Sequence, residues 1–174
     1  MRGAMRRPLI DVLLFDDAVE ALLSDESQLA AMLRVEVALA IAEAAVGLIQ
    51  QQAAARIEAV VGDFAPDWDD LAEGMRRDGV VVPRLVEQLR RTAGAEHAAA
   101  LHKGATSQDI VDTALMLQLG SVLELFDKRL GGVLEQLAAL AHRLDRELAG
   151  AGHGHPGEAR GRRCAIGAGR CRQS

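Results

Sequence analysis

One stretch of the sequence, residues 106–148, constrains the fold more than any other, because it contains no proline and repeats an apolar side chain at alternating steps of three and four. This alternation is typical of a helix that packs along a heptad seam against other helices. At 1.5 Å per residue we expect the helix to be about 60 Å long, and the shorter segments before it cannot cover that length. The seam therefore predicts partners from other chains or from sequence outside these 174 residues. Its positions are Met116, Leu119, Leu123, Phe126, Leu130, Val133, Leu137, Leu140 and Leu144.

A first helix is expected to begin near residue 25 and to end before residue 47. Asp25 and Gln28 have the spacing of a capping box, and Gly47 followed by Leu48 is typical of a helix C-terminus. The apolar stripe is predicted at Leu29, Leu33, Val37, Ile41 and Ala44. The charged positions expected on other faces are Arg34, Glu36 and Glu43.

Three shorter helices are expected to follow. The first covers residues 52–61, and the second covers residues 68–77 with Asp67 as its N-terminal cap. The third has Pro83 in its first turn and stops near Gly94. No stretch of useful length alternates like a β-strand, so the predicted fold class is all-α.

The composition is that of a globular chain, with 49% hydrophobic and 26% charged residues. No apolar run approaches the length that is needed to cross a bilayer. Residues 1–7 are basic, but Asp11 interrupts the apolar stretch that follows, and no signal-peptide cleavage pattern is present. We therefore expect a cytoplasmic protein without a membrane partner.

Charge is distributed unevenly along the chain. Residues 1–148 carry 24 acidic and 15 basic side chains, a net charge of -9, whereas residues 149–174 carry one glutamate and five arginines, a net charge of +4. The second segment also holds seven of the 17 glycines and both cysteines, without periodicity. We predict an N-terminal helical domain over residues 1–105, a long helix over residues 106–148, and a disordered tail over residues 149–174 that reads like an out-of-frame translation.

A polar cluster lies at the entrance to the long helix. Free backbone N–H groups and the positive end of the helix dipole favour an anion there. Lys103 adds a positive charge, Thr106 and Ser107 add hydroxyl donors, and His102 can exchange a proton near neutral pH. The cluster would therefore suit a substrate that carries a carboxylate. The alternative is that Thr106 and Asp109 only cap the helix and that His102 is a surface residue.

Other polar motifs predict no cofactor. His153 and His155 are separated by one residue and lack the further ligands of a zinc site. Cys164 and Cys171 do not form a CxxC pair. The arginines near the C-terminus come without aromatic residues or a recognisable module, so no nucleic-acid partner is expected. We predict neither a metal ion nor another cofactor.

Several segments resemble a known family. The sequence Gly-Ala-Thr-Ser-Gln-Asp at residues 104–109, continued three residues later by Asp-Thr, resembles the first conserved block of the fumarase/aspartase superfamily. This form of the block is most similar to the carboxymuconate cycloisomerase family, and adenylosuccinate lyases carry a looser version. Residues 32–49 and 82–86 also resemble that family, in the same order along the chain.

The resemblance implies a fold, an assembly and a reaction. Members of the superfamily are helical homotetramers, and long helices from all subunits form their central bundle. Residues 106–148 would be the first helix of that bundle. The cycloisomerases are intramolecular lyases that convert carboxymuconate, a small polycarboxylate, into a lactone during the degradation of aromatic compounds through the β-ketoadipate pathway.

The resemblance also implies roles for individual residues. The predicted catalytic residues are His102 and His153. The predicted substrate-binding residues are Lys103, Thr106, Ser107 and Gln108. The serine loop that carries the family's catalytic base, of the form GSSxMPxKxNP, is not found in these 174 residues, so we expect a truncated chain that is inactive alone.

Two alternative functions stay open. One is an elimination reaction of the adenylosuccinate or argininosuccinate lyase type, which uses the same superfamily blocks. The other is a non-catalytic helical oligomerisation module, in which the long helix binds partner chains and the polar cluster serves only as a cap.

Overall fold

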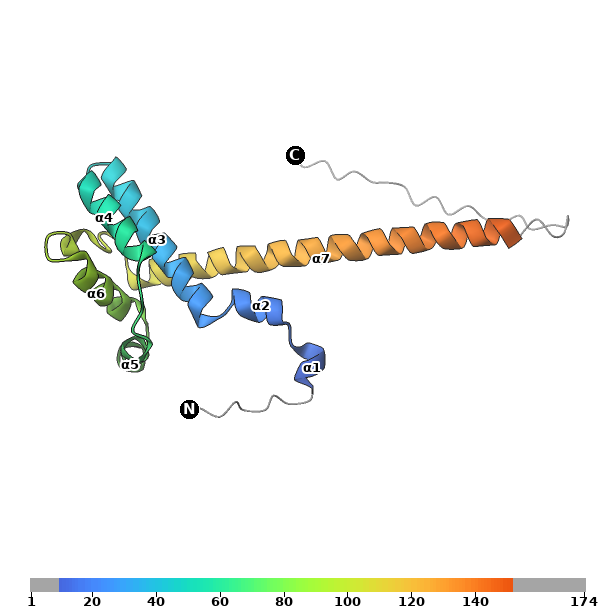
Figure 1. Ribbon diagram of the computed structural model, residues 1–174, viewed down its shortest axis with the longest axis horizontal. Helices are drawn as coiled ribbons and strands as arrows, with labels where there is room; N and C mark the ends of the chain where they lie inside the picture. The colour runs from blue at the N-terminus through green and yellow to red at the C-terminus, as the bar shows by residue number, and fades with distance from the viewer. Residues whose placement is uncertain (1–9, 152–174) are drawn as a thin grey trace. The chain divides into compact units, whose positions relative to one another are not determined.

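The computed structural model describes residues 10–151, and every regular element in this part of the chain is a helix. The all-α class predicted from the sequence is therefore confirmed for these residues (Figure 1). The chain divides into two compact units after Asp127, and each is described by itself. The elements are α1 (Asp11–Leu14), α2 (Asp17–Leu22), α3 (Asp25–Ala45), α4 (Gln51–Gly62), α5 (Trp68–Asp78), α6 (Val82–Ala93), the short 3₁₀ helix η1 (Ala98–Ala100) and α7 (Ser107–Ala151).

The ends of α5 and α6 follow the local sequence. Asp67 caps α5, because its Oδ1 accepts a hydrogen bond from the backbone N–H of Asp70 at 3.1 Å. Gly79 ends that helix with a φ of +71°. Pro83 lies in the first turn of α6, and Gly94 follows its last residue. These predicted boundaries are confirmed to within one residue.

The predicted capping box of α3 is wrong, because the N-terminal cap is Ser24 rather than Asp25. The Oγ of Ser24 accepts a hydrogen bond from the backbone N–H of Ser27 at 3.2 Å, which makes Asp25 the first helical residue. The predicted end at Gly47 is confirmed by two backbone bonds. The N–H of Leu48 donates to the carbonyl of Glu43 at 2.8 Å, and the N–H of Gly47 donates to the carbonyl of Ala44 at 3.1 Å.

The buried stripe of α3 includes the predicted Leu29 and Ala44 but otherwise differs from the predicted one. Ile41 was expected in the core but is 50% exposed, whereas Glu36 and Glu43 were expected on other faces and are buried. The true stripe runs through Leu29, Met32, Glu36, Ala40 and Glu43. It mixes steps of three and four, and this keeps it on one side of a helix with 3.6 residues per turn. The predicted stripe took three successive steps of four, from Leu29 to Ile41, and drifted around the helix.

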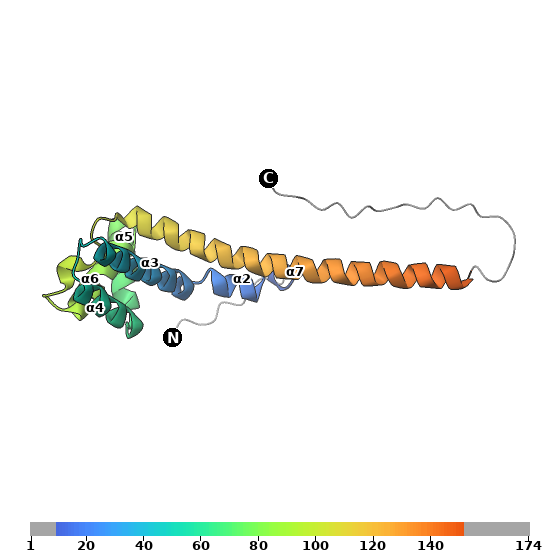
Figure 2. The same ribbon diagram turned by 90° about the horizontal axis from the view of Figure 1, so that it is seen from above.

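The first unit has a single contiguous core among its described residues. Figures 1 and 2 show α3, α4 and α6 grouped near the beginning of α7, and Ile110 and Ala114 of α7 belong to their core. The largest fully buried apolar side chains come from α3, α4, α6, the residue after η1, and the beginning of α7. They are Met32, Ile57, Val82, Leu85, Leu89, Leu101 and Ile110.

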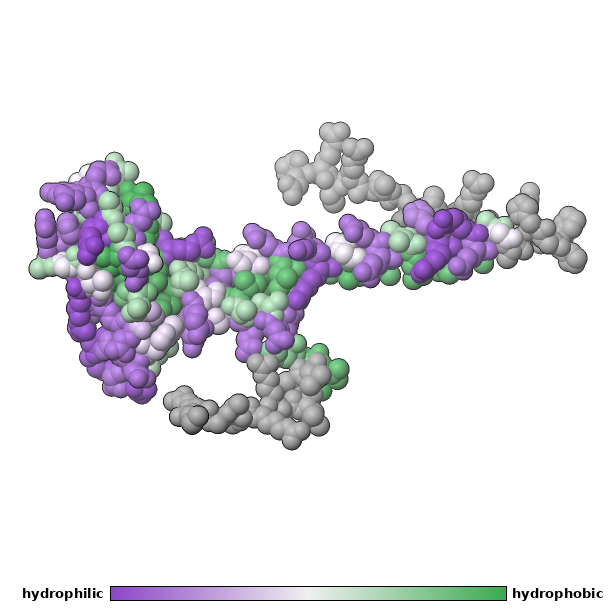
Figure 3. Space-filling view, viewed as in Figure 1, coloured by the Kyte–Doolittle hydropathy of each residue, from purple (hydrophilic) through white to green (hydrophobic). Residues whose placement is uncertain are grey.

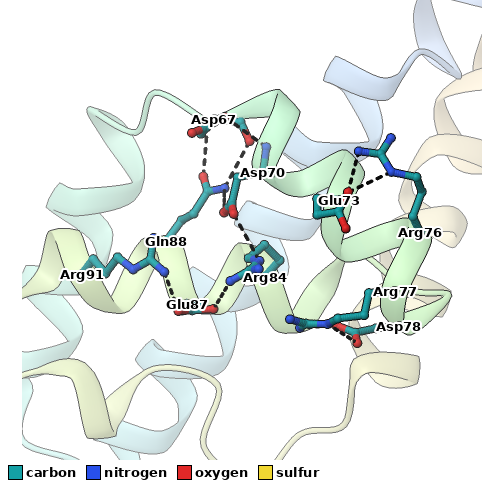
Figure 4. Close-up of polar contacts among 10 residues, drawn as sticks. All are labelled: Asp67, Asp70, Glu73, Arg76, Arg77, Asp78, Arg84, Glu87, Gln88 and Arg91. Atoms are coloured by element: carbon teal, nitrogen blue, oxygen red, sulfur yellow. Dashed lines mark hydrogen bonds and ion pairs between the residues drawn. The ribbon is translucent and has the colours of Figure 1, made fainter.

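Helices α5 and α6 are joined by a polar network (Figure 4). The buried amide of Gln88 accepts a hydrogen bond from the backbone N–H of Asp67 at 3.0 Å and donates to Oδ2 of Asp70 at 2.8 Å. The guanidinium of Arg84 lies 3.3 Å from Oδ1 of Asp70 and 2.7 Å from Glu87. These contacts fix the position of α5 relative to α6.

Within the first unit, α7 buries one face and exposes another. Ile110, Ala114, Gln118 and Val122 recur every four residues and are buried against the N-terminal helices. The side-chain amide of Gln118 donates to the carbonyl of Leu22 at 3.0 Å, which ties α7 to the end of α2.

The opposite face of α7 carries the predicted seam, and all nine of its side chains are exposed, by 38% at Leu119 to 66% at Leu123. Between residues 128 and 150, in the second unit, no side chain is buried. Figure 3 shows the hydrophobic residues, in green, open to the outside along this helix. The prediction that these 174 residues do not cover the seam is confirmed for the described part of the chain.

Helix α7 ends at Ala151, three residues beyond the expected end at residue 148. The rest of the predicted tail, residues 152–174, lies outside the described residues. In the part of the chain that is described, no helix combines the length and the hydropathy of a membrane span.

Candidate active site

The turn between η1 and α7 carries three of the predicted site residues, His102, Lys103 and Thr106. His102 has a φ of +56° and Gly104 has a φ of +79°, so both lie in the left-handed region of backbone conformations. Glycine adopts this region freely, but for another residue it costs roughly 1–2 kcal/mol. The conformation of His102 therefore has to be maintained by contacts from its surroundings.

Two cations, Arg90 and Lys103, anchor this turn to other parts of the fold. Arg90 of α6 donates from Nη2 to the carbonyl of Leu101 at 2.9 Å and from Nε to the carbonyl of Ala98 at 3.1 Å. The Nζ of Lys103 donates to the carbonyl of Leu48, beyond the end of α3, at 2.8 Å. The ammonium group that was predicted to bind substrate is thus occupied by a backbone carbonyl in this structure.

The side chain of His102 contacts a buried carboxyl group. Its Nδ1 lies 2.7 Å from Oε1 of Glu36, whose side chain is wholly inaccessible, whereas the imidazole keeps 15% of its surface exposed. Burial raises the pKa of Glu36 above its ordinary value of 4.5, while the hydrogen bond and charge of His102, and the charge of Arg90, oppose that rise. His102 is therefore not the surface residue of the alternative interpretation.

A second buried carboxyl group, that of Glu43, lies beneath the same turn. A Cβ atom on Gly104 would lie 3.6 Å from its Oε1. Burial raises the pKa of Glu43 as well, and the nearby charge of Lys103 opposes this effect. The Oε2 atoms of both Glu36 and Glu43 are buried without a hydrogen-bond partner among the described residues.

Thr106 and Asp109 form a reciprocal capping pair at the start of α7, as the sequence predicts. The backbone N–H and the hydroxyl of Thr106 donate to Oδ2 of Asp109 at 2.8 and 2.7 Å, and the N–H of Asp109 donates to Oγ1 of Thr106 at 3.3 Å. These bonds, the backbone one first, hold the pKa of Asp109 below its ordinary value. The hydroxyl proton of Thr106 is therefore already engaged.

Ser107 is the first residue of α7 and is half-buried. Its hydroxyl makes no hydrogen bond to the described part of the chain. Gln108 is exposed, and its side-chain amide donates to Oδ1 of Asp112 on the next turn. Of the two predicted hydroxyl donors, Ser107 is the one that can bind a ligand without first breaking a bond.

The structure thus brings His102, Lys103, Thr106, Ser107 and Gln108 together on one turn and the helix start that follows it. The other predicted catalytic residue, His153, lies outside the described residues. Within residues 10–151, no group of three or more His, Cys, Asp or Glu side chains is arranged to hold a metal ion. The absence of a metal and of other cofactors stays a prediction.

Sequence reasoning missed Glu36, Glu43 and Arg90 as neighbours of the site. A signal for the two acids was available, since they are seven residues apart and therefore share one face of α3 with Met32. No comparable local pattern identifies Arg90, because its targets lie in a turn that follows α6.

A separate cavity of about 330 Å³ lies between α3 and α5, near residues 79–81. Its walls include Met32, Leu71, Met75 and Trp68, with Asp25 among the few polar groups. None of the predicted site residues lines it, and its apolar surface offers no acid–base chemistry.

Comparison with curated proteins gives several similar sequences. The chain is 40% identical over 137 residues to a 3-carboxy-cis,cis-muconate cycloisomerase from Bradyrhizobium diazoefficiens, which covers 77% of this chain and 30% of that protein. It is 37% identical over 143 residues to the protein of the same name from Pseudomonas putida, covering 79% and 34%. It is also 38% identical over 126 residues to a nitrosuccinate lyase from Streptomyces davaonensis, covering 69% and 27%.

Solved structures show the same similarity. A fumarate lyase from Mesorhizobium sp. BNC1 matches with a TM-score of 0.71 and 42% identity, over 74% of this chain and 30% of that one. The 3-carboxy-cis,cis-muconate lactonizing enzyme from Pseudomonas putida matches with a TM-score of 0.61 and 36% identity, over 69% and 28%. No protein-family model matches the chain. The chain spans about 30% of the length of the curated relatives that it matches.

Proposed function

We propose that this chain, which belongs to the fumarase/aspartase superfamily, supplies one part of the active site of a 3-carboxy-cis,cis-muconate cycloisomerase. The observation that supports this most is the segment 102–107, which carries an imidazole, an unengaged hydroxyl and a helix N-terminus within six residues of chain. The identity of 40% to a curated cycloisomerase favours carboxymuconate as the substrate.

In the proposed site, the start of α7 binds a substrate carboxylate. Ser107 donates its hydroxyl to one carboxylate oxygen, and the free backbone N–H groups of the first helical turn donate to the other. Thr106 can join them only if its hydroxyl turns away from Asp109. Lys103 contributes its charge to the surroundings of the site, and Gln108 lies at its rim.

The reaction that we propose forms a lactone. A carboxylate oxygen of the substrate bonds to one carbon of a double bond, that π bond breaks, and a proton is added to the neighbouring carbon. The intermediate resembles an aci-carboxylate, and hydrogen-bond donors aimed at its oxygens stabilise the charge that develops. We assign His102 to proton transfer, since an imidazole exchanges protons near neutral pH. His153 would be the second proton-handling residue.

We propose that the 174 residues alone do not turn over carboxymuconate. The chain spans about 30% of its curated relatives, and superfamily active sites draw on conserved blocks that this sequence does not contain. The exposed seam of α7 supports assembly with other chains, which we propose to be a homotetramer in the cytoplasm.

Titration calorimetry with carboxymuconate, together with the loss of its absorbance, tests this function. We expect binding without turnover, and at least tenfold weaker binding by Ser107→Ala, because a hydrogen bond to a charged group is lost. Ser121→Ala is the matched control, since that hydroxyl donates within α7 to the carbonyl of Leu117. Turnover near that of an intact cycloisomerase would contradict the deficiency, and equal binding by Ser107→Ala would contradict the site.

An elimination reaction is the second candidate, and the similarity to a nitrosuccinate lyase favours it. Elimination from a substituted succinate uses the same carboxylate donors and the same proton exchange. Competition between carboxymuconate, nitrosuccinate and adenylosuccinate for the purified chain separates the two candidates, because the cycloisomerase proposal requires carboxymuconate to bind most tightly.

The oligomerisation module is the third candidate, and the exposed seam favours it. In that case the chain associates through α7 but binds none of these polycarboxylates. Light scattering and calorimetry on the same sample distinguish a module from an incomplete enzyme.

A further inference from the structure

The acid beneath His102 has properties that a structural role alone does not require. Glu36 is 1% exposed on the core side of α3, 66 residues before the histidine in the sequence. An ionisable carboxyl group in such a position is costly unless it is paired. Its hydrogen-bond partner is Nδ1 of His102, and its second oxygen has none among the described residues.

The contact between Glu36 and His102 determines which imidazole nitrogen is available for proton transfer. An ionised carboxylate can only accept a hydrogen bond, so a neutral His102 that is paired with it carries its proton on Nδ1. The other ring nitrogen, Nε2, then keeps its lone pair and can take up or release a proton. The reverse arrangement, with a protonated Glu36, would place the ring proton on Nε2.

The backbone around His102 favours a fixed ring. Its left-handed φ of +56° is maintained between the carbonyl of Leu101, which accepts from Arg90, and Lys103, which donates to Leu48. With both neighbours anchored, the contact to Glu36 determines the direction of the imidazole plane.

We propose that Glu36 is a positioning residue that holds the Nδ1–H tautomer of His102 and thereby makes Nε2 the atom that exchanges a proton with the substrate. The catalytic part of this statement rests on the proposed function, whereas the tautomer does not. Glu36 does not touch the substrate; it acts through the ring that it orients.

Nitrogen NMR of the full 174-residue chain, labelled with ¹⁵N-histidine, tests the tautomer directly. The signal of His102 is assigned by its absence in His102→Gln. At pH 8 we expect a protonated, pyrrole-like Nδ1 and an unprotonated, pyridine-like Nε2. A protonated Nε2 in the wild-type chain would overturn the proposal without any variant.

Two substitutions of Glu36 separate positioning from packing. Glu36→Leu removes the acceptor and keeps the volume, and we expect the Nδ1–H signal to be lost. Glu36→Gln keeps the shape, and its amide can either accept from Nδ1–H or donate to an unprotonated Nδ1, so we expect it to hold the Nδ1–H tautomer less strictly than the wild type. Retention of the Nδ1–H tautomer in a folded Glu36→Leu chain would overturn the proposal. If Glu36→Leu does not fold, the wild-type spectrum decides alone, because a protonated Nε2 in that spectrum overturns the proposal.

Glu43→Gln is the matched control, because Glu43 is also a buried acid of α3 but makes no hydrogen bond to His102. We expect the His102 spectrum of this variant to equal that of the wild type, and a changed tautomer would overturn the specific role of Glu36. Carboxymuconate binding is measured on the same samples. A correct tautomer without binding refutes the proposed function, and binding with a protonated Nε2 refutes only the role of Glu36.

Discussion

Gly74 of α5 faces Arg84 of α6 so closely that a Cβ atom on Gly74 would lie 2.7 Å from the Cβ of Arg84. The clashing atom is the Cβ of Arg84, which is fixed to the backbone and cannot move aside as the end of the side chain could. Room for a methyl group would require α5 and α6 to separate, and the contact between Arg84 and Asp70 would then lengthen from 3.3 Å. Helix α5 therefore packs on α6 because it has glycine at this position.

We expect Gly74→Ala to lower the free energy of unfolding by about 1 kcal/mol. Overpacking costs about 1–3 kcal/mol, and the better helix propensity of alanine returns about 1 kcal/mol of that. Gly120→Ala on α7 is the matched control, since a Cβ atom there meets nothing within 4 Å and the propensity gain stands alone. Urea unfolding of both variants measures the difference, and an equal stabilisation of the two would contradict this packing.

Most helix boundaries that depend on nearby residues were predictable, although the cap of α3 is Ser24 rather than the predicted Asp25. Asp67 and the Thr106–Asp109 pair cap their helices within three residues of chain, and Gly47 ends α3 through backbone bonds to the preceding turn. The exposed seam of α7 was predictable for the same reason, because its apolar residues repeat regularly within one continuous segment.

The surroundings of His102 could not be predicted in this way. Glu36 reaches it across 66 residues, and Arg90 reaches Leu101 from a different helix, so no local pattern records either contact. The assumption that charged residues face solvent also placed Glu36 and Glu43 outside the core, whereas both are buried beneath the turn. The binding roles of Ser107 and its neighbours stay predictions.

The buried acid Glu43 predicts a dependence of stability on pH. Its pKa in the folded chain is raised above the ordinary value of 4.5 by burial, so the folded state holds the proton more tightly than the unfolded state. The stability that this provides is fully present below pH 4.5 and is lost as the pH rises through the raised pKa. Wild-type stability should therefore fall between pH 4.5 and pH 8, and Glu43→Gln, which cannot ionise, should fall less.

Urea unfolding at pH 4, 6 and 8 checks this sign. Glu43→Gln should match the wild type at pH 4 and exceed it at pH 8. Glu58→Gln is the control, because Glu58 is an exposed acid on α4 and should not change the slope. A Glu43→Gln chain that is less stable than the wild type at pH 8 would show that the ionised carboxylate is favourable where it lies.

The guanidinium of Arg90 predicts local order at the turn before His102. Arg90→Met removes the donors to the carbonyls of Ala98 and Leu101, and we expect a loss of about 1 kcal/mol in stability. Hydrogen exchange should accelerate at the amides of residues 98–104 more than elsewhere in the first unit. Arg91→Met, which removes an exposed ion pair with Glu87, is the control. Equal exchange rates in the two variants would contradict an anchoring role for Arg90.

The exposed seam of α7 predicts that the chain associates through this helix. Leu123, Leu130 and Leu137 lie on one heptad stripe and are 66%, 63% and 56% exposed. Burying this apolar surface against another chain lowers the free energy. We expect light scattering to give a mass near a multiple of 18.5 kDa, four-fold for a tetramer, and to give 18.5 kDa after all three leucines are changed to glutamate.

The matched control changes three exposed polar residues of the same helix to glutamine, namely Glu124, Lys128 and Glu135. Association should survive in that control, because the charges lie off the apolar stripe. A wild-type chain that stays folded and monomeric at high concentration would contradict both the tetramer and the oligomerisation module, since each requires the seam to be covered by another chain.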